Sequence, residues 1–383
     1  MTRKLYYEDS HLSRFTATVL SCEKTPKGYE VLLDRTAFFP GGGGQDPDTG
    51  TMDGLEVLGG KERGEDVVHY VSGPVTVGAQ VQCCLNWEQR FRRMQNHSGE
   101  HIVSGIIHSR FGYENVGFHM GADFITMDYS GELTAQQVLD IEREANLAVA
   151  KNVPIICSFP SKQELETIDY RSKKELTGQV RIVTVQGYDV CACCAPHVSL
   201  TGEIGMIKLY SHMRHRGGVR LTMLCGLDAL DDYNARCGNI SAISALLSAK
   251  PMEVAQATER LYREHEELKQ KLGGLYRQMC QAKIAQLSDT QGNLVLFEQT
   301  LDMNNLRELI NAAKDKCTGI AAGFLGSDET GYTYIMGSNT VDLRANAKAI
   351  NAAIGGKGGG QKTMIQGTAT ADAETIRAWF AQN

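Results

Sequence analysis

The feature that most constrains the fold is a change of pattern at Trp87. Before it, short β-branched segments alternate with glycine, proline and aspartate turns, which is typical of strands. After it, apolar residues and histidines recur every three or four positions, the period of a helix. The chain is therefore expected to open with a small β-barrel or sandwich, whose strands lie at residues 15–22, 29–34, 54–58, 67–71 and 80–85.

The rest of the chain predicts a multidomain α+β protein. Leu261, Leu268 and Leu275 belong to a seam with steps of three and four residues, which predicts a coiled-coil arm within a helical run from Cys237 to Leu287. Strands and helices alternate after it and indicate a C-terminal α/β domain. We expect four domains: a β-barrel at 1–88, an α+β domain at 89–236, the helical arm at 237–289 and the α/β domain at 290–383.

Bulk properties limit the class of protein. No apolar stretch is long enough for a membrane span, and the first residues resemble no export signal, so a cytoplasmic location without membrane contact is expected. The 11 cysteines then indicate metal ligands or reduced thiols rather than disulfides. The net charge of −6 means that a nucleic-acid partner would need local basic patches.

Two pairs of side chains carry the sharpest chemical signal. His97 and His101 are four residues apart on a predicted helix, so both imidazoles project from one face and could reach one ion. Far downstream, Cys193 and His197 add a thiolate and an imidazole in a turn that contains Pro196. This ligand set suits one zinc ion per chain. A single histidine pair would more often be an ordinary helix surface; the second pair argues against that interpretation.

A second interpretation uses the same helix differently. The pattern His-x-x-Glu-His from His97 to His101 also occurs in zinc peptidases with an inverted motif, in which the glutamate is the general base. Glu100 would then activate water, and Glu142 or Glu144 would supply a third ligand. This interpretation leaves Cys193 and His197 without a role.

Several segments, taken in order, resemble the alanyl-tRNA synthetase editing domain and its free-standing AlaX relatives. Residues 86–101 look like the first zinc motif, and residues 189–205 look like the second. The segment from Leu33 to Gln45 is similar to the family's glycine-rich motif, and residues 217–226 are similar to the strand that closes the domain. Gly355–Gly360 looks like the glycine motif of the synthetase's C-terminal domain.

The resemblance implies a trans-editing hydrolase that deacylates Ser-tRNA(Ala), and also Gly-tRNA(Ala), by zinc-dependent ester hydrolysis. Carried over residue by residue, the metal ligands are His97, His101, Cys193 and His197. The substrate or tRNA contacts implied are Arg35, Gly42, Gly43, Gly44, Gln45 and Arg220. Four protein ligands make a closed zinc site of the structural type, whereas a catalytic zinc keeps one position open, so either role stays open.

This chain departs from the family pattern at two sites. Cys194, Ala195 and Pro196 replace the family's Gly-Gly-Thr, which stiffens the ligand turn and adds a thiol. Glu100 stands where the synthetases have a small hydroxyl residue, so it is the candidate catalytic carboxylate, acting on water or changing amino-acid selectivity. The barrel begins almost at Met1, with no aminoacylation core before it, which predicts editing in trans.

Partners are predicted less specifically. The helical arm and the C-terminal domain are expected to mediate a homodimer. Gly355–Gly360 is not a phosphate-binding P-loop, because Gln361 precedes Lys362 and Thr363. A tRNA-binding protein with purely structural zinc is the alternative from another functional class. Candidate RNA contacts are Arg90, Arg92 and Arg93; Arg171, Lys173 and Lys174; residues 212–216 with Arg220; and Lys357 with Lys362.

Overall fold

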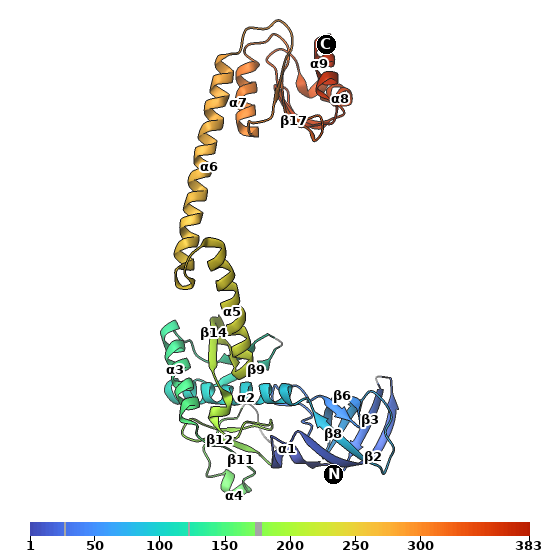
Figure 1. Ribbon diagram of the computed structural model, residues 1–383, viewed down its shortest axis with the longest axis vertical. Helices are drawn as coiled ribbons and strands as arrows, with labels where there is room; N and C mark the ends of the chain where they lie inside the picture. Colours follow the sequence, from blue (N-terminus) through green and yellow to red (C-terminus); the bar gives the residue numbers. More distant parts are fainter. Residues whose placement is uncertain (27, 122, 173–177) are drawn as a thin grey trace. The chain divides into compact units, whose positions relative to one another are not determined.

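The computed structural model describes residues 1–26, 28–121, 123–172 and 178–383 (Figure 1). It contains two compact units, Met1–Ser241 and Ala242–Asn383. The predicted mixed α+β organisation with a long helical segment is confirmed. The finer division into four domains stays a prediction.

The first unit begins with six strands that close into a barrel in the order β2-β3-β7-β6-β5-β8. Alternating side chains such as Val19, Val31 and Val81 fill its core. Strand β5 is only three residues long and was not predicted. Beside the barrel, β1 (Arg3–Lys4) pairs in parallel with β4 (Arg35–Thr36), next to helix α1 (Leu5–Glu8). The barrel strands are β2 (Arg14–Thr25), β3 (Gly28–Leu33), β5 (Gly50–Met52), β6 (Leu55–Arg63), β7 (Asp66–Val71) and β8 (Gln80–Leu85).

Helix α2 (Trp87–Phe111) follows the barrel directly and is buried along most of its length. Its first turn is capped by Asn86, whose side chain accepts a hydrogen bond from the Gln89 amide. Its end is set by Gly112, which takes the left-handed conformation at φ 68° that favours glycine. The helix packs against α3 (Ala135–Lys151) and against strands of the sheets that follow.

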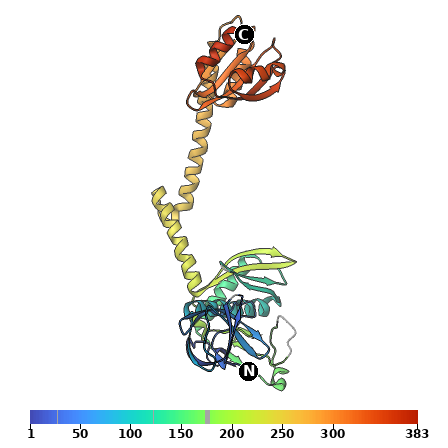
Figure 2. The ribbon, with the colours of Figure 1, turned by 90° about the vertical axis from the view of Figure 1, so that its right-hand side faces the viewer.

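Two small sheets complete the first unit. One has four strands in the order β14-β15-β10-β9, and the other has three in the order β11-β12-β13. Helices α2 and α3 lie against these strands (Figures 1 and 2). Their buried apolar side chains form one core with those of the strands. The elements are β9 (Asn115–Met120), β10 (Ile125–Tyr129), β11 (Ile155–Ser158), α4 (Lys162–Leu165), β12 (Ile182–Val185), β13 (Asp189–Ala192), η1 (Thr201–Ile204), β14 (Ile207–His215) and β15 (Gly218–Cys225).

The helical run differs from its prediction in two respects. Helix α5 (Gly226–Leu247) starts earlier than expected, and a break with a short turn of 3-10 helix (Pro251–Glu253) separates it from α6 (Val254–Ala285). Ser248 has φ 48° and Pro251 begins the next turn, so the backbone cannot continue as one helix there. Helix α6 runs without interruption through Gly273 and Gly274.

The second unit ends in a five-stranded sheet in the order β16-β17-β18-β20-β19. Apolar side chains of α7 cover one face, and those of α8 and α9 cover the other. The elements are β16 (Leu294–Glu298), α7 (Met303–Ala313), β17 (Ala321–Ser327), β18 (Gly331–Gly337), α8 (Leu343–Ala353), β19 (Lys357–Gln361), β20 (Met364–Ala369) and α9 (Ala373–Gln382). Within the described residues of the chain, no helix is both long and apolar enough to cross a membrane.

Candidate metal centre

The structure brings the two predicted pairs of ligands together. His97 and His101 lie on consecutive turns of α2, while Cys193 and His197 lie in the turn after β13. One ligand atom from each of the four residues lies within 4.8 Å of all the others. The Cys193 Sγ is 3.5 Å from His97 Nε2 and 3.4 Å from His197 Nε2. The four side chains could therefore hold one metal ion.

Hydrogen bonds fix the orientation of each imidazole. The Nδ1 atoms of His97, His101 and His197 contact Gln45 Oε1 at 3.0 Å, Asp189 Oδ2 at 2.8 Å and Ser98 Oγ at 3.0 Å. If each Nδ1 carries the proton and donates it, each Nε2 presents its lone pair to the cluster. This is the usual arrangement of a metal-ligating histidine, whose second nitrogen is held by a neighbouring acceptor.

The electrostatics of the centre follow from burial. Burial raises the pKa of the Cys193 thiol and is the largest effect on it. Burial also lowers the pKa of His197 well below its usual value, and the neighbouring His101 and His97 lower it further. A neutral imidazole is ready to bind a cation, whereas the thiol must lose its proton to do so. A divalent ion held by these residues would supply the positive charge that stabilises the buried thiolate.

The turn that carries the two downstream ligands is held by a buried arginine. Arg181 donates from Nη1 to the backbone carbonyls of Cys193 and Ala195 at 3.0 and 2.8 Å. Its guanidinium also lies over the Tyr7 ring, 5.1 Å from the ring centre. The sequence did not predict these Arg181 contacts, because only the fold brings the start of β12, which Arg181 precedes, beside the turn.

The glycine-rich loop lies against the cluster of candidate metal ligands. A Cβ atom added to Gly43 would lie 3.5 Å from the Cys194 Sγ and 4.0 Å from the His97 ring. All four glycines from Gly41 to Gly44 have positive φ, so the loop needs residues without a side chain. Of the predicted contacts, Gly43 and Gln45 thus lie beside His97, Gly42 lies beside the Cys194 thiol, and Gly44 packs against the Phe118 ring.

A buried ion pair anchors this loop to α2. Arg90 donates to Asp48 Oδ2 from Nε at 2.8 Å and also from Nη2, and both side chains are almost completely buried. The same Asp48 oxygen accepts the backbone N–H of Phe39 at 2.7 Å. The interpretation of Arg90 as an RNA contact is therefore wrong, because its guanidinium is consumed inside the protein. Arg93 likewise donates to the Pro47 carbonyl at 2.8 Å.

Glu100 precedes His101 on α2, and its carboxylate is buried. It accepts hydrogen bonds from Ser104 Oγ and Asn115 Nδ2, both at 2.6 Å. The candidate metal clusters among the described residues do not include Glu100, Glu142 or Glu144. Glu142 binds Lys208 and the Leu209 amide instead, which disfavours the ligand set of the zinc-peptidase interpretation.

The remaining predicted contacts lie in ion pairs outside the cluster. Arg35 pairs with Asp34 at 2.9 Å and is exposed. Arg220 makes two hydrogen bonds to Asp128, at 2.6 and 2.7 Å. Arg171 is also engaged internally, whereas Lys173 and Lys174 fall outside the described residues. Residues 212–214 and Arg216 at the β14–β15 hairpin are exposed, as are Lys357 and Lys362.

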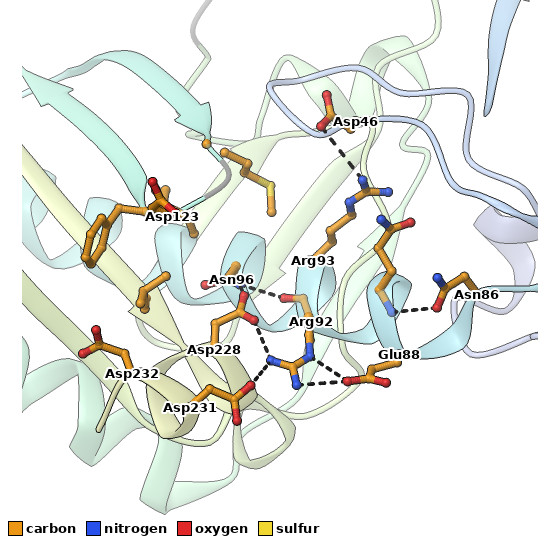
Figure 3. A pocket seen from close by; sticks show the side chains of 16 residues that line it. Asp46, Asn86, Glu88, Arg92, Arg93, Asn96, Asp123, Asp228, Asp231 and Asp232 are labelled. Atoms are coloured by element: carbon orange, nitrogen blue, oxygen red, sulfur yellow. Dashed lines mark hydrogen bonds and ion pairs between the residues drawn. The ribbon is translucent and has the colours of Figure 1, made fainter. Parts of the chain in front are cut away.

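A cavity of about 830 Å³ lies beside the first turns of α2, and Figure 3 shows the side chains that line it. Arg92 points into it and pairs with Glu88, Asp228 and Asp231 at 3.0, 2.7 and 2.7 Å. Its charge is therefore neutralised, and phosphate groups are expected to be repelled here. Six carboxylates line the cavity: Asp46, Glu88, Asp123, Asp228, Asp231 and Asp232.

Comparison with known proteins finds one matching domain family and several similar full-length proteins. The model of the threonyl and alanyl tRNA synthetase second additional domain matches residues 180–221, which include Cys193 and His197. The chain is similar to the alanyl-tRNA editing protein Aarsd1 of Rattus norvegicus, 26% identical over 96% of this chain and 94% of that protein. It is also similar to the alanine–tRNA ligase of Pyrococcus abyssi, 30% identical over 96% of this chain and 42% of that enzyme.

Among solved structures, the C-Ala domain of Aquifex aeolicus alanyl-tRNA synthetase matches 25% of this chain and 92% of its own, with 15% identity and a TM-score of 0.20.

Proposed function

Because the chain is homologous to alanyl-tRNA editing proteins and to the editing region of alanyl-tRNA synthetase across 96% of its length, we propose that it edits mischarged tRNA(Ala) in trans. The proposed reaction is hydrolysis of the aminoacyl ester of Ser-tRNA(Ala), with Gly-tRNA(Ala) as a second substrate. The observation that carries this proposal is the cluster of His97, His101, Cys193 and His197 beside the glycine loop.

One zinc ion per chain fits these residues. The donor set of three imidazole nitrogens and one sulfur is typical of zinc, and each imidazole is already held at its second nitrogen. When bound, zinc can polarise an ester carbonyl or lower the pKa of a water molecule. An aminoacyl ester is already activated, so the protein's main task is to hold it in place and admit water.

The glycine loop and Gln45 are proposed to hold the 3′ end of the RNA. Glycines permit close approach to the backbone, so the amides of Gly42 to Gly44 can contact the terminal adenosine. Gln45 is 2% exposed, and its Oε1 is already used by His97. Its Nε2 donor has no partner among the described residues, so it can donate to the aminoacyl group.

Glu100 is proposed as the residue that accepts a proton from the attacking water. Its carboxylate is 1% exposed and already accepts from Ser104 and Asn115, so it is held in a fixed position. Replacement by glutamine keeps the shape and removes the proton acceptor. Glu100→Gln should lower the rate of deacylation and leave zinc content unchanged; equal loss of zinc would show that Glu100 supports the metal instead.

One experiment separates the candidate functions. The purified full chain is incubated with Ser-tRNA(Ala), Ala-tRNA(Ala) and a peptide library. Release of serine with alanine spared supports editing. Tight tRNA binding without turnover would support an RNA-binding protein with structural zinc, and cleavage of peptides would support the peptidase.

We further propose that the seam of α6 joins two copies of the chain. Leu261, Leu268 and Leu275 are 51%, 64% and 56% exposed, and they are spaced as coiled-coil positions. In a parallel pair Glu264 would face Lys269 of the other copy, which is a favourable charge pair. Sedimentation should show a dimer that Leu268→Lys converts to a monomer. A cytoplasmic location remains a prediction.

A further inference from the structure

Behind His101 lies a buried chain of charged hydrogen bonds that no sequence motif indicated. Arg171 donates from Nε to Asp189 Oδ1 at 2.8 Å and from Nη2 to Oδ2 at 2.9 Å. The same Oδ2 accepts from His101 Nδ1 at 2.8 Å. The side chains of Arg171, Asp189 and His101 are 8%, 1% and 2% exposed, so solvent screens this chain little.

The backbone fixes Arg171 beside the strand that carries its partner. Its N–H donates to the Val190 carbonyl and its own carbonyl accepts from the Ala192 amide, both at 2.9 Å. Arg171 thus lies along β13 and turns its guanidinium back onto Asp189. This bidentate geometry leaves little freedom for the carboxylate.

A second set of metal donors surrounds the same carboxylate. His101, Asp189 and Cys191 also place one ligand atom each within 4.8 Å of one another, and all three are buried. An imidazole, a carboxylate and a thiolate are a donor set that a zinc ion accepts. The imidazole of His101 is shared by both sets, because it can bind a metal through either ring nitrogen.

Resting on the proposed zinc site, we propose that Arg171 is a positioning residue that decides which of the two sets of metal donors holds the ion. Its two N–H groups occupy both oxygens of Asp189, and its positive charge repels a cation from that side. Asp189 then accepts a hydrogen bond from the Nδ1–H of His101. This directs the His101 Nε2 atom to the set that contains His97, Cys193 and His197.

The test measures metal binding by the full chain rather than its activity alone. Zinc affinity is measured by competition with a chromophoric chelator, and the site is reported by the absorption spectrum of bound Co²⁺. Arg171→Met removes the charge and both hydrogen bonds, while Arg171→Lys keeps the charge. Arg236→Met is the matched control, because Arg236 is an exposed arginine on α5 whose contacts are Asp232 and the Tyr210 ring rather than the candidate metal ligands.

Arg171→Met should weaken zinc binding by about 10- to 100-fold and change the Co²⁺ spectrum, as expected when the support of a metal ligand is lost. Adding Cys191→Ser should alter that spectrum further in the Arg171→Met chain and leave it unchanged in the wild type. Arg171→Lys should lose a smaller but measurable part of the affinity, about three- to tenfold, because it reaches one oxygen and keeps the charge. The control should match the wild type.

Wild-type affinity and spectrum in Arg171→Met would overturn the inference. If thermal unfolding shows that this variant does not fold, Arg171→Lys decides in its place, and an unchanged affinity and spectrum there would overturn it equally. Failure of this inference leaves the proposed function intact as long as the wild type binds zinc and releases serine. A wild type that binds no zinc contradicts both.

Discussion

The two glycine clusters of this chain have similar compositions and different structures. Gly41 to Gly44 form a loop in which every φ is positive, from 60° to 144°. Lys357–Gln361, with three consecutive glycines, instead forms the exposed edge strand β19. Composition alone would assign both to flexible loops.

The surroundings explain the difference. The first loop is tied to α2 by the buried pair of Asp48 and Arg90 and faces the metal cluster. In the second, pairing with β20 holds the strand, and a side chain on Gly358 would collide with the Tyr334 hydroxyl. Glycine therefore permits turning in the first unit and close packing in the second. The first cluster is the one expected to affect chemistry.

The largest expected effect comes from breaking the anchor of the first loop. Asp48→Ala leaves Arg90 buried and without its charge partner, which should cost about 3–5 kcal/mol of the free energy of unfolding. Denaturant titration followed by hydrogen exchange should place the loss in residues 1–241. Asp46→Ala is the control, because Asp46 is 74% exposed and 3.9 Å from Arg93, and it should cost less than about 1 kcal/mol.

The next largest effect is a loss of stability in acid, which should be larger in the first unit than in the second. Burial lowers the pKa of His69 in the barrel from 6.5 to about 4, so below pH 6.5 the unfolded state takes up a proton that the folded state refuses. Stability is thus present above pH 6.5 and falls as the pH drops toward 4, by about 3 kcal/mol in total. Hydrogen exchange at pH 7 and 4.5 checks this.

The second unit is the internal reference for this acid effect. Its only histidine is His265, which is exposed. His69→Gln should reduce the pH dependence of the first unit, and the remainder is expected in part from His197, whose pKa burial also lowers. An acid loss of equal size in both units would count against His69 as its cause.

Removing a candidate metal ligand should raise the activation free energy of deacylation by a similar amount. Cys193→Ala is expected to lose zinc and to slow deacylation of Ser-tRNA(Ala) by about 100-fold or more, since a metal contributes several kcal/mol of transition-state stabilisation. Metal analysis and single-turnover deacylation measure both. Lys357→Ala in the second cluster should keep its zinc; a variant of Cys193 that keeps both zinc and rate would exclude it as a ligand.

The smallest effects compare the glycines directly. Gly44→Ala places a Cβ 2.6 Å from the Phe118 ring at φ +88°, so deacylation should fall about tenfold for a strain of one to two kcal/mol, with zinc retained. Gly359→Ala meets nothing within 4 Å and should change stability by less than about 0.5 kcal/mol. Equal effects of the two substitutions on deacylation would remove the distinction drawn between the clusters.

Much of this architecture could be predicted because its signals are local. Five of the six barrel strands, the helices around His97 and Ala145, and the two pairs of candidate metal ligands follow from periodicity and from motif spacing. The partners of the ligands could not be predicted in the same way. The glycine loop, β12 and β13 come together at α2 only in the folded chain. This brings Gln45, Arg171 and Arg181 to the centre, and no local sequence pattern predicts those contacts.

The prediction of RNA contacts was wrong where a basic residue has a buried acidic partner that is distant in the sequence. Arg90 belongs to a basic run typical of an RNA contact, yet its guanidinium is buried on Asp48, 42 residues earlier in the chain. The break between α5 and α6 was missed although Pro251 marks it in the sequence, because the apolar periodicity continues past that proline, and Ser248 gives no strong signal for its left-handed backbone.

The most direct test combines metal analysis with deacylation kinetics on the wild-type chain. The account predicts about one zinc per chain, release of serine from Ser-tRNA(Ala) with Ala-tRNA(Ala) spared, loss of this activity on chelation and its return with added zinc. Full deacylation by metal-free protein, or a zinc-loaded protein that leaves Ser-tRNA(Ala) intact, would contradict it.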